Sequence, residues 1–179
     1  MDIIILWLFL NGVIMSEYNN PANIEIGQGY AGETGETYAN ERTRPFVVFD
    51  SPQMGIRALA RDLSTKSKRF NGDVYKMLAQ FAPDFENPTH NYTKHVVNRL
   101  GGKTKIEDDN DIRNMMVGII EFENGIDSEL SQKYLQKDVF DEGFALSKTS
   151  MDSSYGLDMA RIVHNNTIHV ANYLAGITK

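Results

Sequence analysis

Four stretches of the chain place apolar residues at the three- and four-residue spacing of an amphipathic helix. They cover residues 51–63, 72–83, 86–102 and 111–125. Ser51 followed by Pro52 is typical of a helix start, and Gly125 is typical of a helix end. The short apolar run over residues 45–49 predicts a strand. The pattern therefore predicts a mainly α fold of the α+β class, with helices around a small strand and loop region.

The remaining stretches are less regular. Residues 16–44 are rich in Gly, Asn, Thr and Glu, which predicts a long loop. The pattern is also weak over residues 125–156, and residues 155–176 predict a last helix. We expect a core over residues 15–126 and a C-terminal extension over residues 127–179.

The first fourteen residues, MDIIILWLFLNGVI, are the compositional outlier. This apolar run is shorter than the roughly 20 residues that span a bilayer, and Asp2 stands where a signal peptide is basic. Met15 followed by Ser16 resembles a natural start. Two explanations are open: an upstream start assigned in error, or an apolar segment buried against a partner. Membrane contact is expected only through residues 1–14.

Composition and charge narrow the class of protein. The chain has 179 residues and 41% hydrophobic content, which suits one globular domain. It has no cysteine, so disulfides and thiolate metal sites are excluded. The net charge of −6 argues against broad nucleic-acid binding. Arg57 and Arg61 begin a basic group that predicts either a solvated face or a surface for an anionic polymer.

The histidines do not predict a metal site. His90 and His95 are five residues apart, as are His164 and His169. On a helix this spacing turns two side chains about 140° apart, so one metal could not join them. No serine nucleophile motif is present. We expect no metal and no cofactor, which leaves the acidic residues as the candidate catalytic groups.

Two glutamates end the apolar helix over residues 111–125. At about 100° per residue, Glu123 falls about 20° from Ile112, within the apolar stripe, whereas Glu121 falls at about 180°, facing water. Burial and the negative end of the helix dipole would favour the protonated form of Glu123, as a general acid requires. The alternative is that the helix frays near residue 122 and Glu123 caps it or forms a salt bridge.

Three blocks of sequence, in this order, resemble a widespread family of bacteriophage virion structural proteins. They are NNPANI followed by GYAG, then FDSPQMGIRALARDL, then LAQFAPDFENPTHNYTKHVVNRLG leading to IIEFENG. The resemblance covers residues 18–125 and implies a component of the phage particle. The last fifty residues or so carry no such resemblance.

A more distant resemblance is to lysozyme-like glucosaminidases and lytic transglycosylases. In those enzymes a catalytic glutamate ends an apolar helix, and Asn-rich segments line the sugar groove. Here the Asn-rich segment comes first, which fits a circularly permuted lysozyme-like domain with a groove between this loop and the Glu-bearing helix. The resemblance implies that Glu123 is the catalytic acid. It implies substrate contacts by Asn19, Asn20, Asn23, Tyr30 and Tyr92.

The chain departs from the pattern of the phage virion family at three positions. Ala22 replaces a Gly, while Tyr30 and Phe81 stand where Trp is usual. An aromatic ring is kept at both Trp positions, so a platform for sugars would survive. Ala22 would be strained if its position required a positive φ.

The resemblance implies a virion protein that binds and cleaves the glycan strands of peptidoglycan during genome entry. Its partners would be peptidoglycan and other virion proteins, and its places the virion and, during infection, the host cell envelope. A second carboxylate would come from Glu25, Glu33, Glu36 or Glu86, unless the N-acetyl group or 6-hydroxyl of the substrate serves instead. Two alternatives stay open: a non-catalytic assembly protein of the particle, and a free endolysin for host lysis.

Overall fold

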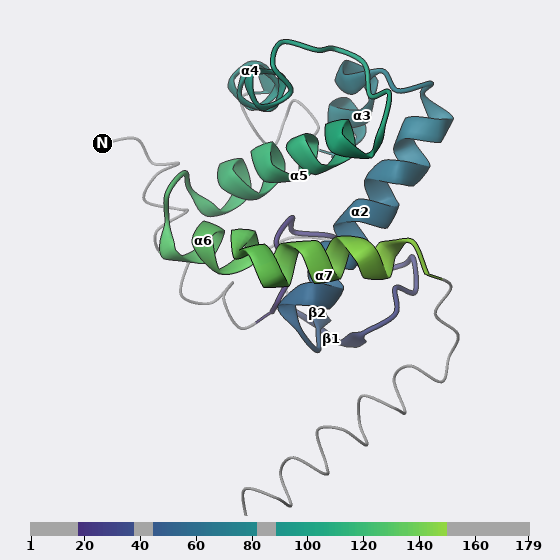
Figure 1. Ribbon diagram of the computed structural model, residues 1–179. Coiled ribbons are helices and arrows are strands. Elements are labelled where there is room, and N and C mark those ends of the chain that lie inside the picture. The colour runs from purple at the N-terminus through teal and green to yellow at the C-terminus, as the bar shows by residue number, and fades with distance from the viewer. Residues whose placement is uncertain (1–17, 38–44, 82–88, 150–179) are drawn as a thin grey trace, which may run out of the picture. The chain divides into compact units, whose positions relative to one another are not determined.

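A computed structural model describes residues 18–37, 45–81 and 89–149 of the chain. Within these residues the chain forms a two-stranded sheet and six helices, so the expected mainly helical class is confirmed (Figure 1). The strands are β1 (Glu33–Thr37) and β2 (Phe46–Phe49). The helices are α2 (Pro52–Arg69), α3 (Val74–Phe81), α4 (Thr89–Arg99), α5 (Asp109–Asn124), α6 (Glu129–Leu135) and α7 (Lys137–Ser147).

Three expectations lie outside the described residues: the apolar segment 1–14, the candidate acid Glu86 and the helix over residues 155–176. None of the described helices combines the length and the apolar composition that crossing a membrane requires.

The two strands pair antiparallel, with Glu33 opposite Phe49 and Thr37 opposite Phe46. The loop prediction is therefore wrong for the five residues of β1. Its sequence, ETGET, has no apolar alternation, and residues 33–36 are exposed. β2 instead supplies the buried side of the sheet, through Phe46, Val47 and Phe49.

Helix α2 begins at Pro52, as predicted, and continues past the predicted end at Leu63 to Arg69. Ser51 occupies the N-cap position, although its hydroxyl donates to Asp50 Oδ1 (2.9 Å) rather than capping the helix. The helix has a long buried face, which makes it a main element of the core. That face includes Met54, Ile56, Ala58, Leu59 and Leu63.

Helix α5 is covered on more than one side. Asp108 caps its start by accepting the Asp111 N–H (2.9 Å). Helix α4 packs across it at Gly118, where an added Cβ would lie only 3.1 Å from Val96 Cα. Helices α2 and α6 contact it elsewhere, and Figure 1 shows α5 between α4 and the α6–α7 pair.

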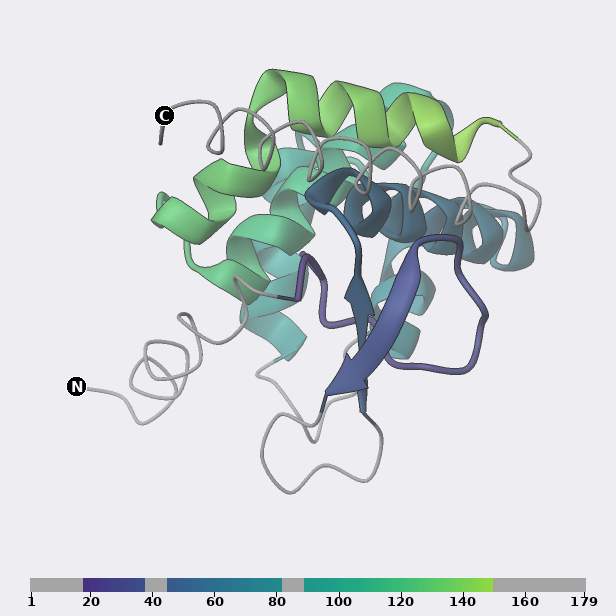
Figure 2. The same cartoon turned by 90° about the horizontal axis from the view of Figure 1, so that it is seen from below.

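Residues 129–147 form α6 and α7, although the sequence pattern predicted less regular structure there. Ser128 explains the start of α6, because its hydroxyl oxygen accepts the Ser131 N–H (3.0 Å). Helix α7 packs against α2, and the two run side by side in Figure 2. Gly143 permits the approach, since a Cβ there would lie 2.6 Å from Ile56 Cβ.

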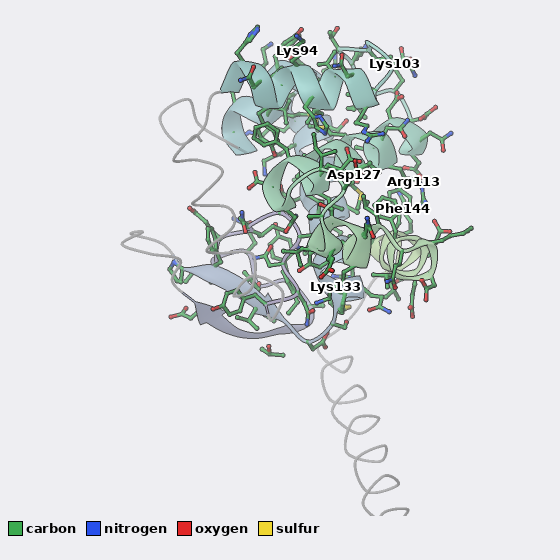
Figure 3. The ribbon with its side chains drawn as sticks, turned by 90° about the vertical axis from the view of Figure 1, so that its left-hand side faces the viewer. Lys94, Lys103, Arg113, Asp127, Lys133 and Phe144 are labelled. Carbon is green, nitrogen blue, oxygen red and sulfur yellow. The ribbon has the colours of Figure 1, made fainter. Side chains whose placement is uncertain are left out.

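Helix α7 is also tied to α5 and belongs to one compact unit with the helices before it. The Arg113 guanidinium lies 4.7 Å from the centre of the Phe144 ring, and Figure 3 shows the two side chains together. The domain limit expected at residue 126 stays a prediction, but it does not coincide with the end of this packing.

The basic pair on α2 has a structural role that its spacing did not indicate. Arg57 is buried, and its Nε donates to the Leu146 carbonyl (3.3 Å). Arg61 Nη1 donates to the Ser147 carbonyl (3.1 Å). Both arginines thus bind backbone carbonyls of the last turn of α7. Because Arg57 is buried, both predictions for it are wrong: it lies neither on a solvated face nor on a surface for an anionic polymer.

Candidate functional site

The Asn-rich segment before β1 is held by the side chains of its own asparagines. Asn20 is buried, and its Nδ2 donates to the carbonyls of Ile24 and Val47 (both 2.9 Å). Its Oδ1 accepts the Ile24 N–H (2.9 Å). Both amide hydrogens of Asn20 are therefore used inside the protein. This geometry assigns Asn20 to loop support and argues against the expected contact with a sugar.

Two asparagines in this segment adopt left-handed backbone conformations. Asn19 has φ 51° and Asn23 has φ 52°, a region that Asn tolerates better than most residues. Ala22 is not among the described positive-φ residues, so the strain considered for it does not arise. Gly55 of α2 allows the segment to approach, because an added Cβ would lie 1.9 Å from the Asn19 carbonyl oxygen.

The end of α5 meets the Asn-rich segment at two neighbouring positions. Asn23 Nδ2 donates to Glu123 Oε2 (2.9 Å), which confirms that Glu123 faces this segment. Asn124 Nδ2 donates to the Pro21 carbonyl (2.7 Å) and to the Ile120 carbonyl (2.8 Å). Glu123 is partly buried, and α5 remains helical through Asn124. The fraying alternative is therefore wrong.

Tyr92 of α4 lies beside Glu123 but is inaccessible to a ligand. It is fully buried, and its ring stacks on Phe122 with centroids 4.4 Å apart. Burial raises the pKa of the Tyr92 phenol well above its ordinary value, and the neighbouring Glu123 carboxylate raises it further. The expected stacking of Tyr92 on a sugar ring is thus contradicted, because none of the ring reaches the surface.

Glu121 is buried, so the prediction that it faces water is wrong. Arg99 Nε donates to Glu121 Oε2 (2.6 Å), and Arg99 Nη2 donates to the other oxygen. His95 Nε2 lies 3.0 Å from the same Oε2. The helical wheel placed Glu121 correctly opposite the first apolar stripe. It could not show that α4 covers that opposite side.

Tyr30 has a different set of neighbours. Its backbone N–H donates to Glu33 Oε1 (2.6 Å), and its ring lies 6.4 Å from that of Phe49. Burial, followed by the negative charges of Asp62 and Glu33, raises the pKa of Tyr30. The ring is part-exposed and remains a candidate platform, although its described contacts are near the strands rather than at Glu123.

Lys133 of α6 is a neighbour of the site that the sequence pattern did not identify. Its Nζ lies 3.2 Å from Asn19 Oδ1, while Asn19 Nδ2 donates to the Phe49 carbonyl (3.0 Å). Partial burial lowers the pKa of Lys133. Figure 3 views the molecule from the side on which Lys133 and Asp127 lie. Only the folded chain brings α6 to the Asn-rich segment, so no local sequence signal could have identified Lys133.

The two acids at the end of α5 have partners of different charge. Glu121 accepts from a guanidinium and contacts an imidazole, whereas the Asn23 amide that binds Glu123 is neutral. Unlike a guanidinium, an amide donor brings no full positive charge to the carboxylate that it binds. The second acids considered from the sequence include Glu33 and Glu36, which are exposed. Across the described residues, no three His, Asp or Glu side chains are placed to hold a metal.

Comparison with known proteins points to a bacteriophage origin. No protein-family model matches the chain. One relative, Protein P5 of Pseudoalteromonas phage PM2, is 30% identical over 109 residues, which are 60% of this chain and 68% of the relative. This relative supports the phage family expected from the sequence blocks. The chain belongs to the same protein family as Protein P5 of Pseudoalteromonas phage PM2.

Proposed function

We propose that this protein is a component of the phage particle that cleaves the glycan strands of peptidoglycan, with Glu123 as the general acid. The observation that carries the proposal is the bond from Asn23 Nδ2 to Glu123 Oε2. It joins a half-buried acid at the end of an apolar helix to an Asn-rich segment, the arrangement that a circularly permuted lysozyme-like domain would have.

The chemistry requires one proton transfer from the protein. Glu123 would donate its proton to the glycosidic oxygen as the bond to the anomeric carbon breaks, while Asn23 holds Oε2. The N-acetyl group or the 6-hydroxyl of the substrate can then attack that carbon, so no second carboxylate is needed. Among the residues first considered for sugar contact, Asn19, Asn23 and Tyr30 keep this proposed role.

The proposed location is the virion, with the host cell envelope as the site of action during infection. Family membership with a phage protein supports the phage assignment. Other virion proteins are the proposed partners, and residues 1–14 remain the proposed docking segment.

The second candidate is a non-catalytic assembly module of the particle. The observation that favours it is that two asparagine side chains of the site bind backbone carbonyls of the Asn-rich segment: Asn20 binds Ile24, and Asn124 binds Pro21. In this alternative, the Glu123–Asn23 bond serves only to order that segment.

Release of soluble fragments from purified Gram-negative sacculi distinguishes the two candidates. We expect the intact chain to release fragments and Glu123→Gln to be slower by about 100-fold or more, the usual contribution of a general acid. Glu142→Gln is the matched control, because Glu142 also accepts a side-chain amide, from Gln53 (3.0 Å), but on the exposed face of α7. No release by folded wild-type protein would contradict the enzymatic proposal and favour assembly.

A further inference from the structure

Ile126, just past the end of α5, is an apolar side chain that the fold leaves in solvent. Its exposed fraction is 57%, and among the described residues only Tyr75 of α3, at 54%, is a large apolar side chain of similar exposure. A single exposed apolar residue needs no explanation by itself. Ile126 differs in its position, because it follows Glu123 by three residues on the turn that joins α5 to α6.

The end of α5 is fixed to the Asn-rich segment immediately before Ile126. Asn23 Nδ2 donates to Glu123 Oε2 (2.9 Å), and Asn124 Nδ2 donates to the Pro21 carbonyl (2.7 Å). Two residues of chain span at most about 7 Å between Cα atoms, so the Cα of Ile126 lies within that distance of the Asn124 Cα. The exposed side chain is therefore held beside the junction that contains the proposed acid.

The turn that carries Ile126 is held in one conformation. Gly125 has φ 93° and Asp127 has φ 59°, so both flanking residues are left-handed. The Ser131 hydroxyl donates to the Gly125 carbonyl, and Gln132 Nε2 donates to the Asp127 carbonyl (3.1 Å). A left-handed residue other than glycine persists where the surrounding structure imposes it. The turn thus keeps the Ile126 backbone in place while its side chain stays in solvent.

We propose that Ile126 is a substrate-contact residue, which packs against the apolar surface of an N-acetylated sugar in the glycan strand beside Glu123. This inference rests on the proposed function, because that strand is the proposed substrate. Binding sites for small molecules combine apolar contacts with a few polar groups that fix the orientation of the ligand. Asn23 and Glu123 supply polar groups at this junction, and Ile126 supplies an apolar contact.

The role of Ile126 differs from that of the acid in a way that kinetics can measure. An apolar contact with a sugar ring is made equally in the bound substrate and in the transition state. Its loss therefore raises KM and leaves kcat unchanged, whereas loss of the proton donor lowers kcat. Because Ile126 is exposed, replacing it should leave the thermal unfolding transition where it is in the wild type.

The first test measures kinetics on soluble, peptide-free glycan strands. We expect Ile126→Ser to raise KM about tenfold at unchanged kcat, the size expected for one lost apolar contact in a binding site. Ile126→Leu should keep the wild-type KM, because leucine restores the apolar surface.

Tyr75→Ser is the matched control, because it also removes a large apolar side chain that is about half exposed. Tyr75 follows Val74, whose N–H donates to the carbonyl of Thr104 (3.1 Å), in the chain before α5 begins. Tyr75 thus lies near the start of α5, whereas Glu123 lies near its end. We expect Tyr75→Ser to keep the wild-type KM and kcat.

A second readout does not depend on activity. In a Glu123→Gln chain carrying 13C-methyl isoleucine, the δ1 methyl resonance of Ile126 should shift when the peptide-free strands are added. Ile126→Leu identifies that resonance, because it alone removes it. In the same Glu123→Gln chain, Ile126→Ser should raise the Kd for the strands about tenfold, and Tyr75→Ser should leave it unchanged.

The outcomes separate the inference from the proposed function. A methyl resonance indifferent to bound strands, or wild-type KM and Kd in Ile126→Ser, would overturn the inference and leave the proposed cleavage standing. A shifted resonance in a protein whose wild-type chain releases no fragments would keep the contact and reject catalysis. Strands that bind neither the wild-type nor the Glu123→Gln chain, with both folded, would overturn the inference and the proposed function together.

Discussion

At the scale of single residues, the proposed chemistry depends on whether Glu121 or Glu123 can give up a proton to a substrate. Glu121 is enclosed by Arg99 and His95 and is thereby committed to an ion-paired role. Glu123, two residues on, is half-buried and accepts a hydrogen bond from a neutral amide. Two carboxylates on one turn of helix can thus have different roles, set by their surroundings.

The Asn-rich segment should be sensitive to the smallest addition on α2. Ala normally stabilises an open helical position relative to Gly, by up to about 1 kcal/mol. In Gly55→Ala the new Cβ would lie 1.9 Å from the Asn19 carbonyl oxygen, so we expect a loss of about 1–3 kcal/mol in the free energy of unfolding. Urea unfolding measures it.

Gly35→Ala is the control for this substitution, because an added Cβ there meets nothing within 4 Å. A Gly55→Ala chain as stable as the wild type would show that the segment does not pack on α2 as described.

Some residues of the site could be predicted from sequence and others could not. The periodicity of α5 placed Glu123 in the first apolar stripe, and the lysozyme-like resemblance implied that this acid faces the Asn-rich segment, as the Asn23–Glu123 bond shows. It misplaced Glu121, because a single helix does not reveal a second helix covering its other side. The asparagines were identified by type, but their hydrogen bonds separate Asn20, which is structural, from Asn23, which contacts the acid.

At the scale of elements, α4 and α5 form the unit that fixes both acids. Gly118 lets the helices approach, and Asp108 and Asp111 fix the start of α5. The side chain of Asp111 is buried. Its Oδ1 accepts a hydrogen bond from Lys103 Nζ (2.8 Å), and its Oδ2 accepts one from the Glu107 N–H (2.9 Å). These bonds join the preceding turn to the first turn of α5.

The start of α5 should make folding stability depend on pH in the acid range. The hydrogen bond from Lys103, opposed by burial, lowers the pKa of Asp111 below its ordinary value near 3.8. The stabilisation is therefore present above that ordinary value and is lost as the pH falls through the folded-state pKa. We expect Asp111→Asn to be less stable than the wild type at pH 6, with the difference shrinking below about pH 4.

Thermal unfolding at several pH values measures this difference, and Asp138→Asn, at an exposed position in α7, is the reference. A wild-type advantage over Asp111→Asn that persists undiminished at pH 2 would contradict the assignment.

At the scale of the whole described unit, the packing continues well beyond the region resembling known families. Helix α7 buries Phe140 and Phe144 and lies against α2. The sequence did not predict this, because short helices such as α6 and α7 show little periodicity by themselves. The broad helical class, in contrast, followed from the longer amphipathic stretches, which are the strongest local signal.

Removal of α6 and α7 should therefore destabilise the unit. A chain ending at residue 126 would expose the face of α2 that α7 covers and would lose two buried Phe side chains, each contributing about 1.5–3 kcal/mol. We expect it to lose the cooperative thermal transition followed by circular dichroism. A chain ending at residue 149 should retain that transition. Equal transitions in both would show that α7 is dispensable for the fold.

The division of roles between the two acids is tested most directly by measuring stability and fragment release together in Glu121→Gln and Glu123→Gln. Glu121→Gln should lose about 1–3 kcal/mol of unfolding free energy, a range reduced from that of a fully buried pair because Arg99 is partly exposed. Glu123→Gln should keep near-wild-type stability and lose release of soluble fragments from sacculi. The account would be contradicted if the two variants were equally stable and lost fragment release equally, or if Glu123→Gln kept full activity.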